Sequence, residues 1–284
     1  MSRHSLGATA AAAPPRGAVR DDPRQWTGSS FRVQVWVLTQ RSLRSAFGDA
    51  RLVFLGLLQP VVLLLLFSQV FAGVGTLPGV AEYGGYINFL MPATMVNIAM
   101  TSAMGSGAGL LAETYTGVLG RFRRMPISLL SVLLARTLSD TARLAVQLAV
   151  AIVAAVLALG FSARGGVLGM TAALAVTLVV GWGLGWVFVA LATWLKKPET
   201  MQAVTFIAVF PLMFGSSAYM PLDTMPAWMR AVSTVNPLTY AIDAIRALSL
   251  GRPVGMSVVL ALVLALTTAT LGATAATRNF RRSA

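Results

Sequence analysis

Six long stretches without a charged residue constrain this chain more than any other feature. They lie at about residues 52–71, 86–111, 144–163, 167–195, 201–222 and 256–277. The hydrocarbon core of a bilayer is about 30 Å thick, so a helix that crosses it needs about 20 apolar residues. Each stretch meets that length. The sequence therefore predicts an all-α integral membrane protein with six transmembrane helices.

The composition argues against soluble domains, intramembrane enzymes and ion-coupled transporters. Hydrophobic residues make up 56% of the chain and charged residues only 11%, whereas a soluble domain carries about 25% charged residues. An intramembrane enzyme or an ion-coupled transporter places ionisable groups inside the bilayer, and the six stretches contain none. There is no cysteine and one histidine, His4. No catalytic or metal-binding set is expected.

The cations indicate the orientation. A net charge of +13 can indicate a nucleic-acid partner, but membrane proteins also collect Lys and Arg in their cytoplasmic loops. Counted segment by segment, 18 of the 22 cations fall on one side of the predicted membrane and four on the other. This bias predicts that both termini are cytoplasmic, and we expect the lipid bilayer as partner and no nucleic acid.

Two segments precede the first span. Residues 1–27 are rich in Ala, Pro and Arg and are expected to form a disordered cytoplasmic tail. Residues 28–48 have a helical pattern in which Phe31, Val35 and Leu38 form an apolar row. A helix lying in the cytoplasmic membrane interface is expected, with a soluble helix leading into the membrane as the alternative.

The predicted spans contain prolines and closely spaced glycines. Pro60, Pro92 and Pro211 lie inside the first, second and fifth, where neighbouring helices can satisfy the carbonyl groups that proline frees. Glycine occupies every second position of residues 105–109 and of residues 181–185. They permit close approach of helices, and packing within the chain is favoured over a dedicated dimer surface.

The segment between the second and third spans holds a dense set of charges. Glu113, Gly117 and Arg121 are spaced i, i+4, i+8, which places them in one stripe of a helix. The glycine would leave a notch between a carboxylate and a guanidinium group. Arg123 and Arg124 add charge on other faces. The segment fits either a docking surface for a soluble partner or a loop made basic only to fix the topology.

A bend is expected directly after these charges. Pro126 disfavours helix at the preceding residue and can open a new one. Arg136, Asp140 and Arg143 are spaced to pair along that second helix. The sequence therefore predicts two short cytoplasmic helices joined at a sharp bend, before the third span.

A short helix is predicted on the outer side, between the fifth and sixth spans. Asn236 can cap a helix that Pro237 opens, and Gly251 can end it. Asp243 and Arg246 can pair at i, i+3. About 13 residues are too few to span the membrane, so the helix should be re-entrant or interfacial. It would act as a gate over an exit path or as a cap on the neighbouring spans.

These residues carry a resemblance to a known family. The pattern Glu113-x-x-x-Gly117-x-x-x-Arg121-x-x-x-x-Pro126 resembles the cytoplasmic signature of ABC-2 type transporter permeases, and "LAETYTGVLGRFRRMPIS" is similar to the daunorubicin-resistance (DrrB-like) drug-exporter branch. The segment "NPLTYAIDAIRALSLG" is similar to the part of that branch before its last span. The resemblance covers about residues 30–280, so residues 28–284 are assigned to one permease domain.

The resemblance implies an export machine in the bacterial plasma membrane. The chain would be the permease subunit of an ATP-binding-cassette exporter for a lipophilic or amphipathic drug, antibiotic or lipid. A polysaccharide or lipid-intermediate permease is the alternative, and an ion-coupled transporter is less favoured. A second permease chain, identical or a sister, would complete the pathway. A separate ATPase subunit would bind ATP and Mg, because this sequence has no G-x-x-x-x-G-K-[ST] phosphate loop. The implied ATPase-coupling residues, none of them catalytic, are Glu113, Gly117, Arg121, Arg123, Arg124 and Pro126.

Overall fold

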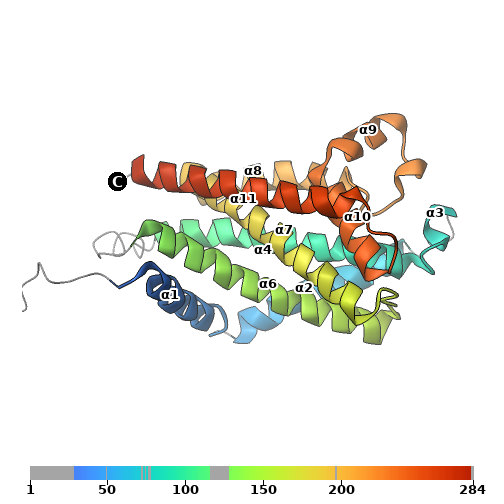
Figure 1. The fold of residues 1–284 in the computed structure, drawn as a ribbon, viewed down its shortest axis with the longest axis horizontal. Coiled ribbons are helices and arrows are strands. Elements are labelled where there is room, and N and C mark those ends of the chain that lie inside the picture. Colours follow the sequence, from blue (N-terminus) through green and yellow to red (C-terminus); the bar gives the residue numbers. More distant parts are fainter. Residues whose placement is uncertain are drawn as a thin grey trace, which may run out of the picture.

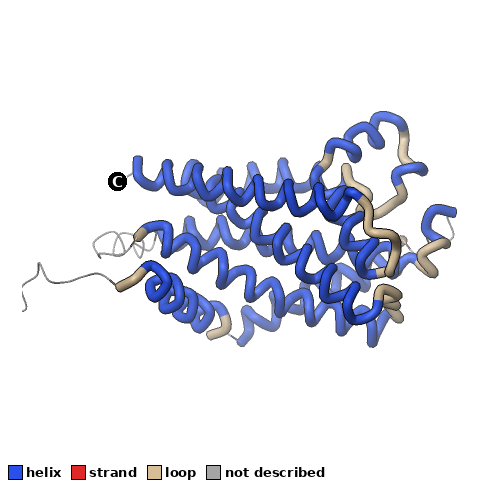
Figure 2. Tube along the Cα trace, in the orientation of Figure 1, coloured by secondary structure: helices blue, strands red, loops and turns tan. Residues whose placement is uncertain are grey.

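The described part of the chain is a bundle of helices (Figures 1 and 2). The computed structural model describes residues 29–48, 50–71, 73, 75, 78–115, 128–195 and 197–282, and these contain no strand. The long helices, in chain order, are α1 (Phe31–Ala46), α2 (Ala50–Val70), α4 (Tyr86–Tyr115), α6 (Leu129–Leu159), α7 (Gly166–Leu195), α8 (Pro198–Phe214) and α11 (Met256–Arg282). The short ones are α3 (Pro78–Ala81), η3 (Leu222–Thr224), α9 (Ala227–Val235) and α10 (Pro237–Ser249).

Local sequence explains where several helices begin and end. The Ser128 hydroxyl accepts a hydrogen bond from the Ser131 amide and caps α6. Gly160 follows α6 with a φ of 68°, a left-handed conformation that glycine adopts without strain. Pro198 opens α8. Pro60, Pro92 and Pro211 lie inside α2, α4 and α8, as predicted.

Helix α7 lies at the centre of the bundle, against α4, α6, α10 and α11. Glycine permits these close approaches. A Cβ atom added at Gly107 would lie 2.6 Å from the Phe188 carbonyl oxygen, and one added at Gly183 would lie 2.5 Å from the Ala265 carbonyl oxygen. These glycines therefore serve packing within the chain, as the sequence favoured.

Four of the predicted spans are helices long and apolar enough to cross a membrane: Tyr86–Tyr115, Leu130–Leu159, Gly166–Leu195 and Met256–Asn279. The other two are shorter apolar helices, Phe54–Val70 and Pro198–Phe214. The predicted fifth span reached residue 222, but α8 ends at Phe214 and the residues up to Pro221 are not helical. Apolar composition continues there beyond the helix, so composition alone overestimated its length.

The bundle has two distinct ends. Helix α1 and the C-terminal end of α11 lie at one end, and α3, α9 and α10 lie at the other (Figure 1). The sequence predicted this separation between the termini and the segment that joins the last two spans. Which end faces the cytoplasm stays a prediction from the distribution of cations.

The segment between the second and third spans differs from the prediction. The expected second cytoplasmic helix and the third span form one continuous helix, α6, of 31 residues. The boundary expected near residue 144 is absent because Arg136, Asp140 and Arg143 are all compatible with helix. The bend expected around Pro126 lies outside the described residues, as does the predicted tail of residues 1–27.

Candidate functional site

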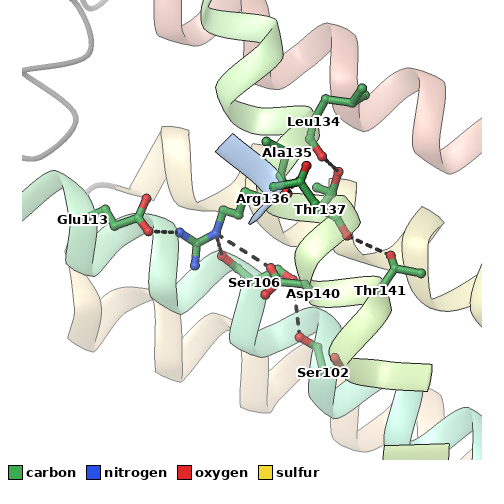
Figure 3. A network of polar contacts seen from close by, with 10 residues as sticks. Ser102, Ser106, Glu113, Leu134, Ala135, Arg136, Thr137, Asp140 and Thr141 are labelled. Atoms are coloured by element: carbon green, nitrogen blue, oxygen red, sulfur yellow. Dashed lines mark hydrogen bonds and ion pairs between the residues drawn. The ribbon is translucent and has the colours of Figure 1, made fainter. Parts of the chain in front are cut away.

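An arginine-centred network joins the end of α4 to the first half of α6. Arg136 Nη1 lies 2.7 Å from Glu113 Oε1, and Arg136 Nε donates a hydrogen bond of 3.2 Å to the Ser106 carbonyl oxygen. Arg136 Nε also lies 3.8 Å from Asp140 Oδ2. Figure 3 shows the guanidinium group reaching from α6 towards α4. We call Ser106, Glu113, Arg136 and Asp140 the Arg136 cluster.

Two glycines on α4 make room for arginines from α6. A Cβ atom added at Gly109 would collide with the Arg136 guanidinium group, and one added at Gly105 would lie 3.1 Å from Arg143 Nη2. The Arg136 side chain is 14% exposed and the Glu113 side chain 42%. The ion pair therefore lies at the boundary of the bundle, where the cation is shielded and the carboxylate is half open to its surroundings.

Helix α1 lies against the same part of α6. Gln34 Oε1 accepts hydrogen bonds of 3.0 Å from the Ser128 amide and from the Ser131 hydroxyl. Gln34 Nε2 donates to the Ser29 carbonyl oxygen at 2.7 Å. One side chain thus fixes the start of α1 to the cap of α6, while Trp36 on α1 stays largely exposed. Whether α1 lies in the membrane interface, rather than being a soluble helix that leads into the membrane, stays a prediction from the sequence.

A cavity of about 250 Å³ lies between α1, the end of α4 and α6. Its charged lining residues are Arg41, Glu113, Arg136, Asp140 and Arg143. Three cations and two carboxylates give the lining a net positive charge. A cavity with this lining can accept an acidic side chain or the C-terminal end of a partner helix.

The predicted coupling residues divide into two groups. Glu113 is described, and its ion-pair partner in the described part is Arg136, on the far side of the connecting segment. Gly117, Arg121, Arg123, Arg124 and Pro126 lie outside the described residues. The stripe expected to join Glu113 to Arg121 therefore stays a prediction.

The predicted pairing along α6 is half correct. Arg136 pairs with Asp140 at i, i+4, but Asp140 and Arg143 form no ion pair among those of the described residues. Instead Arg143 Nε is shielded from solvent and has no hydrogen-bond partner there. The spacing permitted both pairs, and the position of α4 beside α6 decided between them.

The short helix predicted between the fifth and sixth spans is present as α10. Helix α10 has 13 residues, the Asn236 side chain accepts from the Leu238 amide, and Pro237 is its first residue. The Asn236 side chain also donates to the carbonyl oxygens of Leu212 and Gly215, which anchors α10 to the end of α8. A left-handed glycine, Gly251, follows the helix with a φ of 66°.

Arg246 on α10 is a buried hub. Its Nη1 atom lies 2.8 Å from Asp243 Oδ1, which also accepts from the Ser217 hydroxyl. Its other guanidinium nitrogens donate to the carbonyl oxygens of Phe89 and Ser217, and the Phe89 ring centroid lies 4.0 Å away. Burial lowers the pKa of Arg246, and the Asp243 carboxylate acts in the opposite direction.

The hub connects α10, the N-terminal end of α4 and the segment after α8. Sequence spacing indicated the pair between Asp243 and Arg246 but not the contacts with Phe89 and Ser217, which are far away in the chain.

Among the described residues, no group of three or more His, Cys, Asp or Glu side chains is placed to hold a metal ion.

Comparison with known proteins gives a consistent result. Residues 33–250 match the family described as ABC-2 type transporter. The chain is 31% identical over 194 residues to a daunorubicin resistance ABC transporter permease protein, DrrB1, of Streptomyces coeruleorubidus, covering 68% of this chain and 67% of that protein. It is 23% identical over 224 residues to a protein named probable doxorubicin resistance ABC transporter permease protein DrrC, of Mycobacterium tuberculosis, covering 79% of each.

Proposed function

Because this chain belongs to the ABC-2 type transporter family, we propose that it is the permease subunit of an ATP-driven exporter. It moves a lipophilic or amphipathic molecule out of the cytoplasm, and a separate ATPase subunit drives it. Two similarly named relatives belong to drug-resistance transporters. The cargo, the ATPase, the pairing of two permease chains and the cytoplasmic position of both termini are parts of this proposal.

The Arg136 cluster is the observation that carries the proposal. It joins the two helices that flank the connecting segment, and Gln34 fixes α1 to the same place. A push or pull on α1 or on the connecting segment would therefore reach α4 and α6, which extend through the bundle (Figure 1). A soluble partner that binds at this end has a direct mechanical connection to the membrane helices.

The charge of the cavity beside the cluster supports an ATPase partner at this surface. Positive lining groups attract a carboxylate from a docking protein, and a partly shielded ion pair is stronger than one in bulk water. The connecting segment adds Arg121, Arg123 and Arg124 in sequence. Under this proposal the chain supplies the pathway and the contact, and hydrolysis of ATP takes place on the partner.

The proposal is tested by reconstitution. The neighbouring reading frames are searched for an ABC ATPase, and the chain is purified with that ATPase and placed with it in liposomes. We expect a stable complex whose ATP hydrolysis rises when the permease is present. A test variant carries Glu113→Gln together with Arg136→Gln, which should leave the chain inserted in the membrane but reduce its stimulation of ATP hydrolysis. The proposal would be refuted if the ATPase did not bind the chain and if its rate of ATP hydrolysis were the same with and without the chain.

A further inference from the structure

A second cavity, of about 200 Å³, lies inside the bundle between α2, α4 and α6. It differs from the charged cavity beside α1 in the rest of its lining, and Arg143 lines both. Its walls come from the middle of α2 and of α4, and Tyr219 adds to the lining. Gln59 and Thr101 line it and are exposed, so it opens to the surroundings between α2 and α4.

One end of this cavity is polar and lacks partners. Arg143 and Gln147, one turn apart on α6, both line it. Arg143 Nε and Gln147 Oε1 are shielded from solvent and have no hydrogen-bond partner in the described part of the chain. Gln147 Nε2 donates to the Gly56 carbonyl oxygen at 3.3 Å, which holds the amide in place. Leaving such groups unpaired is costly, so this end is suited to a ligand.

Among the described residues that line this cavity, Arg143 alone has a charged side chain. Asp140, three residues earlier, is ion-paired with Arg136 instead. The absence of a side chain at Gly105 leaves the space that the Arg143 guanidinium group occupies. A guanidinium group presents several donors in a plane and binds a carboxylate or a phosphate in preference to other groups.

The other end of the cavity is apolar and aromatic. Leu63, Leu64 and Phe67 line it from α2, and the rings of Phe67 and Tyr219 meet edge to face with centroids 5.4 Å apart. The lining of α4 extends from Ala93 to Ser102, which is about 13 Å along a helix axis. A cation thus lies at one end of an elongated space and an aromatic pair at the other.

We propose that this cavity binds an amphipathic anion. Its carboxylate or phosphate group pairs with Arg143, and its apolar body lies along α2 towards Phe67. The identification of this ligand as cargo rests on the proposed export function, but the binding site does not. A free amphipathic acid and the headgroup end of an anionic lipid share the required chemistry.

Binding of tritiated laurate and of tritiated dodecanol to the purified chain in a neutral detergent tests this proposal. The two probes have the same chain length and differ in the carboxylate. We expect Arg143→Gln to weaken laurate binding about tenfold and to leave dodecanol binding within about twofold. Phe67→Ala should weaken both probes. Arg252→Gln, which removes a cation outside this cavity, should change neither.

Unchanged laurate binding by Arg143→Gln, or equal affinity of the wild-type chain for the two probes, would overturn the proposal. Retained dodecanol binding shows that the variant is folded. If Arg143→Gln does not fold, Arg143→Lys keeps the charge but loses the planar donors, and we expect an intermediate loss of laurate binding; no loss overturns the proposal.

One further measurement distinguishes a lipid from a free acid as the ligand, and another distinguishes failure of the export function from failure of this inference. Displacement of laurate by phosphatidylglycerol but not by phosphatidylcholine in nanodiscs assigns the site to a lipid headgroup, and no displacement by either assigns it to a free acid. Complex formation with the ATPase is measured on the same preparations. A chain that binds laurate but no ATPase refutes the export function alone, and the reverse result refutes this inference alone.

Discussion

Glu113 Oε1 lies 2.7 Å from Arg136 Nη1, and this ion pair joins the last turn of one long helix to the interior of the next. Sequence spacing had placed Glu113 in a stripe with Arg121, within its own helix. The partner in the described part of the chain instead comes from across the connecting segment. The pair therefore fixes the relative position of α4 and α6.

We expect Glu113→Gln and Arg136→Gln to reduce stimulation of the partner ATPase about tenfold. The loss of stability should stay below about 1 kcal/mol for Glu113→Gln, because that carboxylate is 42% exposed and solvent screens it. ATP hydrolysis in proteoliposomes and thermal unfolding in detergent measure the two effects.

The charge exchange Glu113→Arg with Arg136→Glu checks the same pair. It should recover part of the lost stimulation, because the attraction between α4 and α6 is restored. Glu82→Gln serves as the matched control, since Glu82 pairs with Arg252 at 3.6 Å outside the Arg136 cluster and its side chain is 69% exposed. Equal losses for Glu82→Gln and Glu113→Gln would argue against a coupling role.

Gln34→Leu is expected to release α1 from α6. The substitution removes the acceptor of two hydrogen bonds, from the Ser128 amide and the Ser131 hydroxyl, at a cost of about 1–2 kcal/mol. Hydrogen–deuterium exchange across residues 31–46 should become faster. Gln40→Leu, at an exposed position of the same helix, should leave the exchange unchanged, and identical behaviour of the two variants would contradict the assignment.

Arg246→Gln should destabilise the bundle by about 2–4 kcal/mol, because it leaves Asp243 and the carbonyl oxygens of Phe89 and Ser217 without their charged donor. Arg252→Gln is the comparison, since the Arg252 side chain is 37% exposed and should contribute less than about 1 kcal/mol. Thermal unfolding of both variants in detergent gives the difference. Similar melting temperatures would show that Arg246 does not hold α10, α4 and the segment after α8 together.

Gly272→Ala should lower the melting temperature by roughly 2–12 °C, since overpacking costs about 1–3 kcal/mol. The added Cβ atom would lie 2.7 Å from the Trp186 carbonyl oxygen, where α7 and α11 meet. Gly255→Ala provides the control because nothing lies within 4 Å of its added Cβ atom. A melting temperature as high as that of the control would mean that the two helices separate easily.

The proposed orientation can be mapped with single cysteines, because the natural chain has none. A cysteine introduced as Ala227→Cys at the start of α9 should react with a membrane-impermeant maleimide added to intact cells. One introduced as Arg44→Cys on α1 should react only after the cells are opened. The opposite pattern would invert the predicted topology and place the Arg136 cluster outside.

Local sequence was sufficient for the positions of most helices and for several of their ends, but not for the continuity of α6. Apolar runs predicted the positions of the six bundle helices, and Asn236 with Pro237 predicted the start of α10. These features depend on residues within a few positions of one another, so hydrophobic periodicity and capping chemistry reveal them. The same reasoning extended the fifth span beyond Phe214, because apolar composition does not distinguish a helix from the irregular segment that follows it.

The sequence by itself thus determined an all-helical chain with long apolar segments, a strong bias in its cations and a family signature around Glu113. The tertiary structure decided the partners: Arg136 for Glu113, Phe89 and Ser217 for Arg246, and no hydrogen bond for Arg143 Nε among the described residues. The physical reason is that capping and periodicity are short-range properties. Pairing between distant residues depends on how closely helices approach, which glycines such as Gly109 permit but do not specify.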